Sequence, residues 1–115
     1  MKKLLIIVDM QNDFINGSLA NPDAAAIVTP ICDYIKTLKE EDSIICTMDT
    51  HKQNYLSTPE GKKLPIKHCL EGTAGWGIDQ NIYNAINDAD KCFKYITKDT
   101  FGYLGWFSYG IDCNI

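Results

Sequence analysis

Three ionisable side chains stand at the ends of segments that have the character of buried strands. Asp9 and Asp49 each follow a mainly apolar run, and Lys98 ends a third strand-like segment. If these segments are parallel strands, their carboxyl ends lie along one edge of the sheet, where open α/β sheets bind their ligands. We therefore predict that the three groups converge in a functional site. The alternative for an isolated acid in this position is a simple turn that ends the strand.

The two histidines of the chain lie close to one of these acids in sequence. His51 comes two residues after Asp49, and His68 follows in the same long segment without helical or strand periodicity. Two imidazoles and a carboxylate are a suitable ligand set for a divalent Zn, Fe or Mn ion. The sequence therefore predicts a metal site. The alternative for each histidine alone is a hydrogen-bonded loop residue.

The apolar pattern alternates between strand and helix along the chain. Continuous apolar runs predict strands buried on both faces. The sequence Asn21-Pro22-Asp23, followed by apolar residues at helical spacing, predicts a helix with a capped start. The expected elements are a strand at 3–9, a helix at 22–40, a strand at 42–49, a long loop at 50–77, a helix at 78–89 and a strand at 92–98. Strands joined by covering helices form right-handed βαβ units, so we predict an α/β fold with a parallel sheet.

The composition is that of an ordinary folded domain. The 115 residues are 45% apolar and 23% charged, and we expect one domain. The net charge is −4 and no basic cluster exceeds a pair of lysines, which argues against nucleic acids and anionic membranes and favours a small-molecule ligand. The first apolar run is too short for a signal peptide or a membrane span, so we expect a cytoplasmic protein.

Four short motifs resemble the nicotinamidase-like members of the isochorismatase-type cysteine hydrolases. They occur in the family's order and spacing and lie within residues 3–106. The motifs are Val8-Asp9-Met10-Gln11-Asn12-Asp13-Phe14, Asp49-Thr50-His51, His68-Cys69-Leu70-Glu71-Gly72-Thr73-Ala74-Gly75-Trp76 and Lys98-Asp99-Thr100-Phe101. The resemblance implies a three-layer α/β/α open parallel sheet, the isochorismatase-like hydrolase fold.

The resemblance also implies a mechanism based on a Cys-Asp-Lys triad. Asp9 would accept the proton of the nucleophilic thiol and later return it to the leaving amine. Lys98 would hold its ammonium group near both and favour the thiolate by charge. The substrate would be a small-molecule amide such as nicotinamide, cleaved to the acid and ammonia through a thioester.

Further site residues follow from the same resemblance. The metal would be held by Asp49, His51 and His68, with Glu60 as an extra ligand, although Glu60 is equally compatible with a solvated loop glutamate. Phe14 and Phe101 occupy positions that line the ring pocket in such enzymes. Plain core packing is the alternative for both.

The chain departs from the family pattern after Lys98. In the family the nucleophile follows a further helix and strand, whereas the one remaining cysteine, Cys113, comes fifteen residues after Lys98. This spacing is too short for both elements, so we expect that Cys113 is not the nucleophile and that 1–115 is a single, incomplete domain comprising the N-terminal part of the fold.

These observations leave three functional hypotheses. The first is a metal-assisted cysteine amidohydrolase of the nicotinamidase type, and the second is a catalytically inactive, truncated remnant that retains a metal or small-ligand site. A flavodoxin-like phosphate binder ranks last because no glycine-rich phosphate loop follows the first strand. The family's strand order would also place the first strand in the middle of a complete sheet. Its edge would then be exposed here, and we expect a homo-oligomer or self-association through it.

Overall fold

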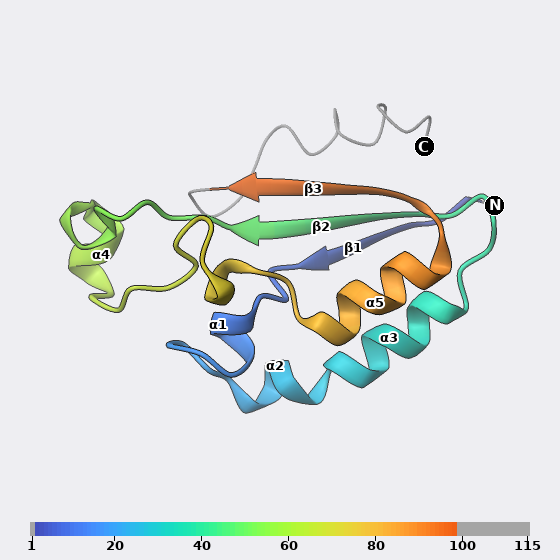
Figure 1. Ribbon diagram of the computed structural model, residues 1–115, viewed down its shortest axis with the longest axis horizontal. Coiled ribbons are helices and arrows are strands. Elements are labelled where there is room, and N and C mark those ends of the chain that lie inside the picture. Colours follow the sequence, from blue (N-terminus) through green and yellow to red (C-terminus); the bar gives the residue numbers. More distant parts are fainter. Residues whose placement is uncertain (1, 99–115) are drawn as a thin grey trace.

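The computed structural model describes residues 2–98, which form a parallel three-stranded sheet. The strands are β1 (Leu4–Val8), β2 (Ser43–Asp49) and β3 (Cys92–Lys98), in the order β1-β2-β3 (Figure 1). Six of the seven residues of β2 are buried, and only Asp49 at its carboxyl end is partly exposed, as expected for the central strand of the three. The prediction of an α/β fold with a parallel sheet is confirmed.

The register aligns the carboxyl ends of the three strands. Val8 pairs with Thr47 at the end of β1, and Asp49 pairs with Lys98 at the end of β3. Asp9 follows β1 directly, so the strands deliver one charged residue each to the same edge of the sheet. Figure 1 shows the three arrows pointing toward this edge, where the long segment after β2 also lies.

Two amphipathic helices cover one face of the sheet. Helices α3 (Val28–Lys36) and α5 (Gln80–Ala89) lie side by side beneath it (Figure 1). Their apolar side chains recur at helical spacing and pack against the inner side chains of β1 and β2. The buried core contains Ile7, Met10, Ile15, Val28, Ile35, Ile44, Cys46, Ile82 and Ile86.

The helix predicted at 22–40 is two helices. Helix α2 (Pro22–Ala26) ends where α3 begins, with Ile27 as the connecting residue, and α3 ends at Lys36. The cause is Pro30, which has no N–H to donate to the carbonyl group four residues earlier and crowds that carbonyl. The capped start was correct, since the Asn21 side chain accepts a 2.9 Å hydrogen bond from the Asp23 N–H group.

The segment predicted as a loop at 50–77 contains short helices. These are the 3₁₀ helices η1 (Tyr55–Ser57) and η2 (Ala74–Trp76) and helix α4 (Pro59–Lys63). Helix α4 starts at a standard signal, because the Thr58 hydroxyl accepts a 3.0 Å hydrogen bond from Gly61 and a proline follows the cap. A further short helix, α1 (Asn12–Ile15), follows Asp9 and had no periodicity long enough to predict it.

The outer edge of β1 has no partner strand within residues 2–98. Along it, Leu4, Ile6 and Val8 are exposed on the face that α3 and α5 do not cover. Unpaired edges of this kind are templates for strand pairing, and self-association through β1 stays a prediction. In the described part of the chain, no helix has both the length and the apolar character needed to cross a bilayer.

Candidate active site

Asp9 and Lys98 form an ion pair at the carboxyl edge of the sheet. Lys98 Nζ lies 2.8 Å from Asp9 Oδ2, and the Lys98 side chain is buried while that of Asp9 is 23% exposed. Asp9 has a φ of 52°, in the left-handed region, which turns the chain away from β2 directly after β1. The structure therefore brings together the two residues that we predicted as catalytic. Their roles in catalysis stay predictions.

Thr47 holds the second oxygen of the same carboxylate. Its hydroxyl donates a 2.7 Å hydrogen bond to Asp9 Oδ1 and accepts one of 3.1 Å from the Asp9 N–H group. Thr47 is fully buried in β2, between the strands that carry Asp9 and Lys98. Sequence analysis missed this residue, although a threonine inside a buried apolar run was a possible signal because its hydroxyl must find a partner.

Asp49, His51 and His68 form a compact group of potential metal ligands. One ligand atom of each lies within 4.8 Å of the others. Asp49 Oδ2 lies 3.0 Å from His51 Nε2 and 3.3 Å from His68 Nε2, and both imidazoles are buried. The Nδ1 atom of His68 lies 2.7 Å from the carbonyl oxygen of Ile66. A carbonyl can only accept, so Nδ1 donates this hydrogen bond, and Nε2 is the ring nitrogen that can offer a lone pair to a metal ion.

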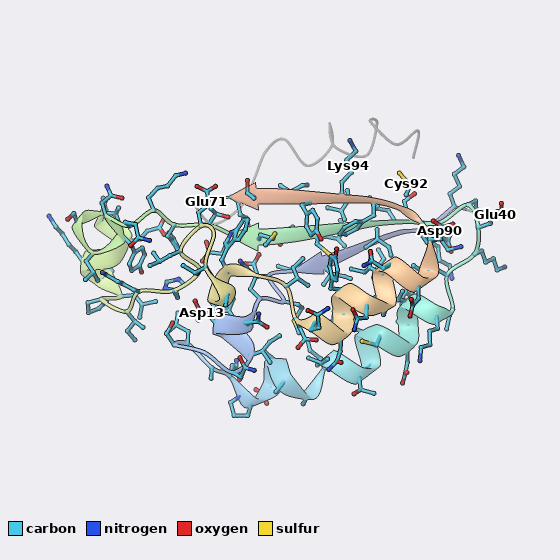
Figure 2. The ribbon with its side chains drawn as sticks, in the orientation of Figure 1. Asp13, Glu40, Glu71, Asp90, Cys92 and Lys94 are labelled. Carbon is cyan, nitrogen blue, oxygen red and sulfur yellow. The ribbon has the colours of Figure 1, made fainter. Side chains whose placement is uncertain are left out.

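A short parallel bridge pairs His51 with Leu70 and so brings the segment that carries His68 close to His51. The His51 N–H group donates to the carbonyl of Cys69 at 2.9 Å, and the Glu71 N–H group donates to the carbonyl of His51 at 2.9 Å. Asp13, labelled beside α1 in Figure 2, accepts a 2.7 Å hydrogen bond from the Cys69 N–H group. The loop that carries His68 is thereby fixed to two separate parts of the fold.

The remaining predicted site residues occupy different positions around this group. Glu60, in α4, lines a small hollow with Asp49, His51 and His68, but it does not belong to the compact group of three. The Phe14 ring lies with its centroid 5.6 Å from that of His68. Phe101 lies outside the described residues. The ligand role of Glu60 and the pocket role of Phe14 stay predictions.

Tyr55 is a site residue that the sequence did not reveal. Its ring is almost fully buried and lies with its centroid 4.5 Å from that of His51 and 5.0 Å from that of His68. Its hydroxyl donates a 2.8 Å hydrogen bond to the carbonyl of Leu64. Burial raises the pKa of Tyr55, with smaller contributions from the carboxylates of Glu60 and Asp49. The neutral phenol ring of Tyr55 therefore packs against both imidazole rings.

An open hollow lies beside Lys98 of the ion pair and His51 of the histidine pair. Its volume is about 550 Å³, and its lining includes Lys98, His51, Glu60 and Glu71. Figure 2 shows Glu71 by the arrowheads of β2 and β3. At the rim, the Glu71 carboxylate forms an ion pair with the ammonium group of Lys52, and both side chains are largely exposed. The hollow is large enough for a small organic molecule.

The thiols closest to the site are unsuited to nucleophilic attack. Cys69 is fully buried, and burial raises its pKa, as do the nearby carboxylates of Asp49 and Asp13. Burial raises the pKa of Cys46 to about 12. A cysteine attacks as the thiolate, so neither residue is a candidate nucleophile. Cys113 lies outside the described residues.

The sequence is similar to one protein family and to two curated relatives. The isochorismatase domain model matches residues 3–103. The chain is 38% identical over 124 aligned positions to a nicotinamidase of Saccharomyces cerevisiae, covering 84% of this chain and 56% of the relative. It is 36% identical over 77 residues to a nicotinamidase/pyrazinamidase of Mycobacterium tuberculosis, covering 64% and 41%. The chain thus spans about half the length of these relatives.

Solved structures share the arrangement of the elements. A pyrazinamidase/nicotinamidase from Streptococcus mutans superposes with a TM-score of 0.77 at 23% identity, covering 100% of this chain and 67% of that one. A pyrazinamidase of Pyrococcus horikoshii in complex with zinc gives a TM-score of 0.58 at 28% identity, covering 88% and 55%. The similarity to solved structures confirms the predicted isochorismatase-like hydrolase fold.

Proposed function

The chain belongs to the isochorismatase domain family and is nicotinamidase-like within it, and we propose that it carries the proton-transfer and metal-binding groups of a nicotinamidase-type cysteine amidohydrolase. The observation that carries the proposal is the 2.8 Å ion pair between Lys98 and Asp9, whose lysine lines the same hollow as His51. A buried lysine that holds a partly exposed carboxylate at the mouth of a sheet is suited to proton transfer.

The proposed substrate is a small amide, with nicotinamide as the first candidate. The two curated relatives, a nicotinamidase and a nicotinamidase/pyrazinamidase, support this class. The hollow of about 550 Å³ beside Lys98 and His51 could accept a single aromatic ring and its amide group.

The proposed reaction passes through a thioester. A cysteine sulfur attacks the amide carbonyl carbon while the thiol proton moves to a carboxylate oxygen of Asp9. Asp9 returns this proton to the amide nitrogen as the C–N bond breaks, which releases ammonia. Water then cleaves the C–S bond, giving the acid and restoring the thiol. Throughout, Lys98 and Thr47 hold the two carboxylate oxygens in place.

The donor set of Asp49, His51 and His68 fits a divalent metal ion. The fit rests on the hydrogen bond at His68 Nδ1, which leaves Nε2 as the ring nitrogen facing the group, on the nearby Asp49 carboxylate and on the 4.8 Å spread of the three ligand atoms. The zinc complex of the Pyrococcus horikoshii relative supports zinc as the first ion to test. When bound, the ion would supply a Lewis acid that attracts a substrate lone pair and so orients the ring.

A second candidate function is binding of a metal or small ligand without turnover. The burial of two thiols in the described part of the chain favours this function. Cys69 is fully buried beside the site and Cys46 lies within the core, so neither sulfur is accessible to a substrate. Under this hypothesis the histidine group binds its ion, but no sulfur reaches a carbonyl carbon next to Asp9.

Ammonia release from nicotinamide separates the two candidates. We expect no appreciable turnover by the 115-residue chain alone, because Cys69 and Cys46 are buried and their raised pKa values disfavour the thiolate. Addition of the part of the yeast nicotinamidase that has no counterpart in this chain should supply the thiol and produce turnover. This turnover should disappear in Asp9→Asn.

Two other results are decisive. A complementing fragment that binds the chain without producing turnover would contradict the amidohydrolase proposal and leave the second candidate. Turnover by the chain alone that vanishes in Cys113→Ala would show that Cys113 is a working nucleophile and that the spacing argument is wrong.

A further inference from the structure

The carboxamide of Gln11 is fully buried, and two of its three hydrogen bonds join the backbone of a single residue, Asp49. Its Oε1 atom accepts a 2.8 Å hydrogen bond from the Asp49 N–H group. Its Nε2 atom donates at 2.8 Å to the carbonyl of Asp49 and at 2.8 Å to the carbonyl of Trp76. A single side chain therefore binds both the N–H group and the carbonyl group of Asp49.

This side chain continues the sheet beyond the end of β1. The last backbone pair of β1 with β2 is Val8 with Thr47, and the left-handed turn at Asp9 then takes the backbone away. Two residues further along β2, the Gln11 carboxamide pairs with Asp49 on that side. On the other side Asp49 pairs with Lys98 of β3. Asp49 therefore has the Gln11 carboxamide on the side of β1 and Lys98 of β3 on the other side, although β1 itself ends before this point.

We propose that Gln11 is a positioning residue of the metal site, because it fixes the Asp49 backbone from which the carboxylate reaches both imidazoles. The inference rests on the proposed metal binding by Asp49, His51 and His68. Asp49 Oδ2 lies 3.0 Å and 3.3 Å from the two Nε2 atoms. A rotation of the Asp49 peptide groups would move this oxygen away from one imidazole or both.

The proposal differs from a purely structural role in what it predicts for the folded protein. A glutamine that only satisfied buried polar groups would change the free energy of unfolding and leave the metal site of the folded molecules as it was. A positioning residue changes the metal affinity and the coordination geometry of molecules that remain folded. Outer partners of metal ligands typically contribute about 10–100-fold in affinity.

The test compares Gln11→Met with wild type and with Asn12→Ala in the full 115-residue chain. Methionine has a similar length and cannot form the three hydrogen bonds. Asn12 is a matched control, since its side chain also donates to a backbone carbonyl, that of Ala74 in η2 at 2.9 Å, and Ala74 is not one of the proposed metal ligands. The measurements are the zinc dissociation constant by chelator competition and the absorption spectrum of bound Co²⁺, both corrected for the folded fraction.

We expect Gln11→Met to weaken zinc binding about 10–100-fold and to change the Co²⁺ spectrum, while Asn12→Ala matches wild type. If Gln11→Met does not fold, Gln11→Asn keeps the carboxamide one methylene short of Asp49 and should show the same two effects. Wild-type affinity and spectrum in a folded Gln11 variant would overturn the inference and leave the metal site standing. A wild-type chain that binds neither ion would overturn the inference together with the proposed metal binding.

Discussion

The hydroxyl of Thr47 donates a 2.7 Å hydrogen bond to Oδ1 of Asp9 and so links the end of β1 to the middle strand of the described sheet. Because Lys98 donates to the other oxygen at 2.8 Å, both oxygens of the Asp9 carboxylate are engaged. The orientation of the proposed general base therefore depends on all three strands. A carboxylate held in this way is prepared for proton transfer before the substrate arrives.

Replacement of Thr47 by valine should destabilise the protein. Valine has the same shape but lacks the hydroxyl, so Asp9 loses one donor at its carboxylate in a partly buried position. Hydrogen bonds to charged groups contribute about 1.5–3 kcal/mol, and we expect the free energy of unfolding in urea to fall by about that amount.

Thr47→Ser is the matched control for this prediction, because serine keeps the hydroxyl and loses only a methyl group. It should retain most of the stability that valine loses. If Thr47→Val is as stable as wild type, the hydrogen bond contributes little to stability. Equal destabilisation of Thr47→Ser and Thr47→Val would mean that the methyl group contributes as much as the hydrogen bond.

The histidine pair should determine metal binding. We expect purified wild-type protein to contain a divalent ion in near-stoichiometric amount and the double variant His51→Ala, His68→Ala to contain none, as measured by elemental analysis. The reason is that this variant removes two of the three ligand atoms that lie within 4.8 Å of one another.

Glu60→Ala provides the comparison for the metal prediction. Glu60 lines the hollow beside the histidines but lies outside the compact group, so its removal should lower the metal content less than the double variant does. A loss as complete as that of the histidine variant would make Glu60 a full ligand. Equal metal content in the double variant and the wild type would remove the assignment of His51 and His68.

The strands and the convergence of charged residues could be predicted because they depend on local pattern and on topology. The continuous apolar run at 4–8 correctly predicted a strand, but the expected burial on both faces was wrong within residues 2–98, because no described helix covers the face of Leu4, Ile6 and Val8. Once three such strands are parallel, the positions of Asp9, Asp49 and Lys98 follow from chain direction alone. The break at Ile27 could also have been predicted, since Pro30 lies inside the expected helix.

The polar residues that support the site could not be predicted in the same way. Gln11 bonds to backbone groups of Asp49 and Trp76, which lie 38 and 65 residues away in sequence. The spacing of residues in the sequence does not reveal such a long-range hydrogen bond. Other polar side chains of similar length could also bond to these backbone groups. Tyr55 was missed for a related reason, since a tyrosine in a segment without periodicity gives no sign that its ring packs on two imidazoles.

Asp42 should make the stability of the fold depend on pH. One carboxylate oxygen accepts a 2.8 Å hydrogen bond from the Lys3 N–H group and the other a 2.7 Å hydrogen bond from the Lys39 N–H group. These bonds, with the one from Lys39 first, lower the pKa of Asp42 below its ordinary value of 3.8. A pKa that is lower in the folded state stabilises the protein above the unfolded pKa, and this stabilisation is lost as pH falls through the folded value.

We therefore expect wild type to be more stable than Asp42→Asn at neutral pH, because the amide is uncharged and has one acceptor oxygen, so it can accept from only one of the two backbone donors. The difference in the free energy of unfolding between the two proteins should shrink as pH falls below about 4. Urea unfolding of both proteins across this pH range measures the difference directly. The contributions of titrating groups that the two proteins share cancel in this difference. A difference that stays constant down to acid pH would show that the Asp42 carboxylate does not gain its charge more readily in the folded state.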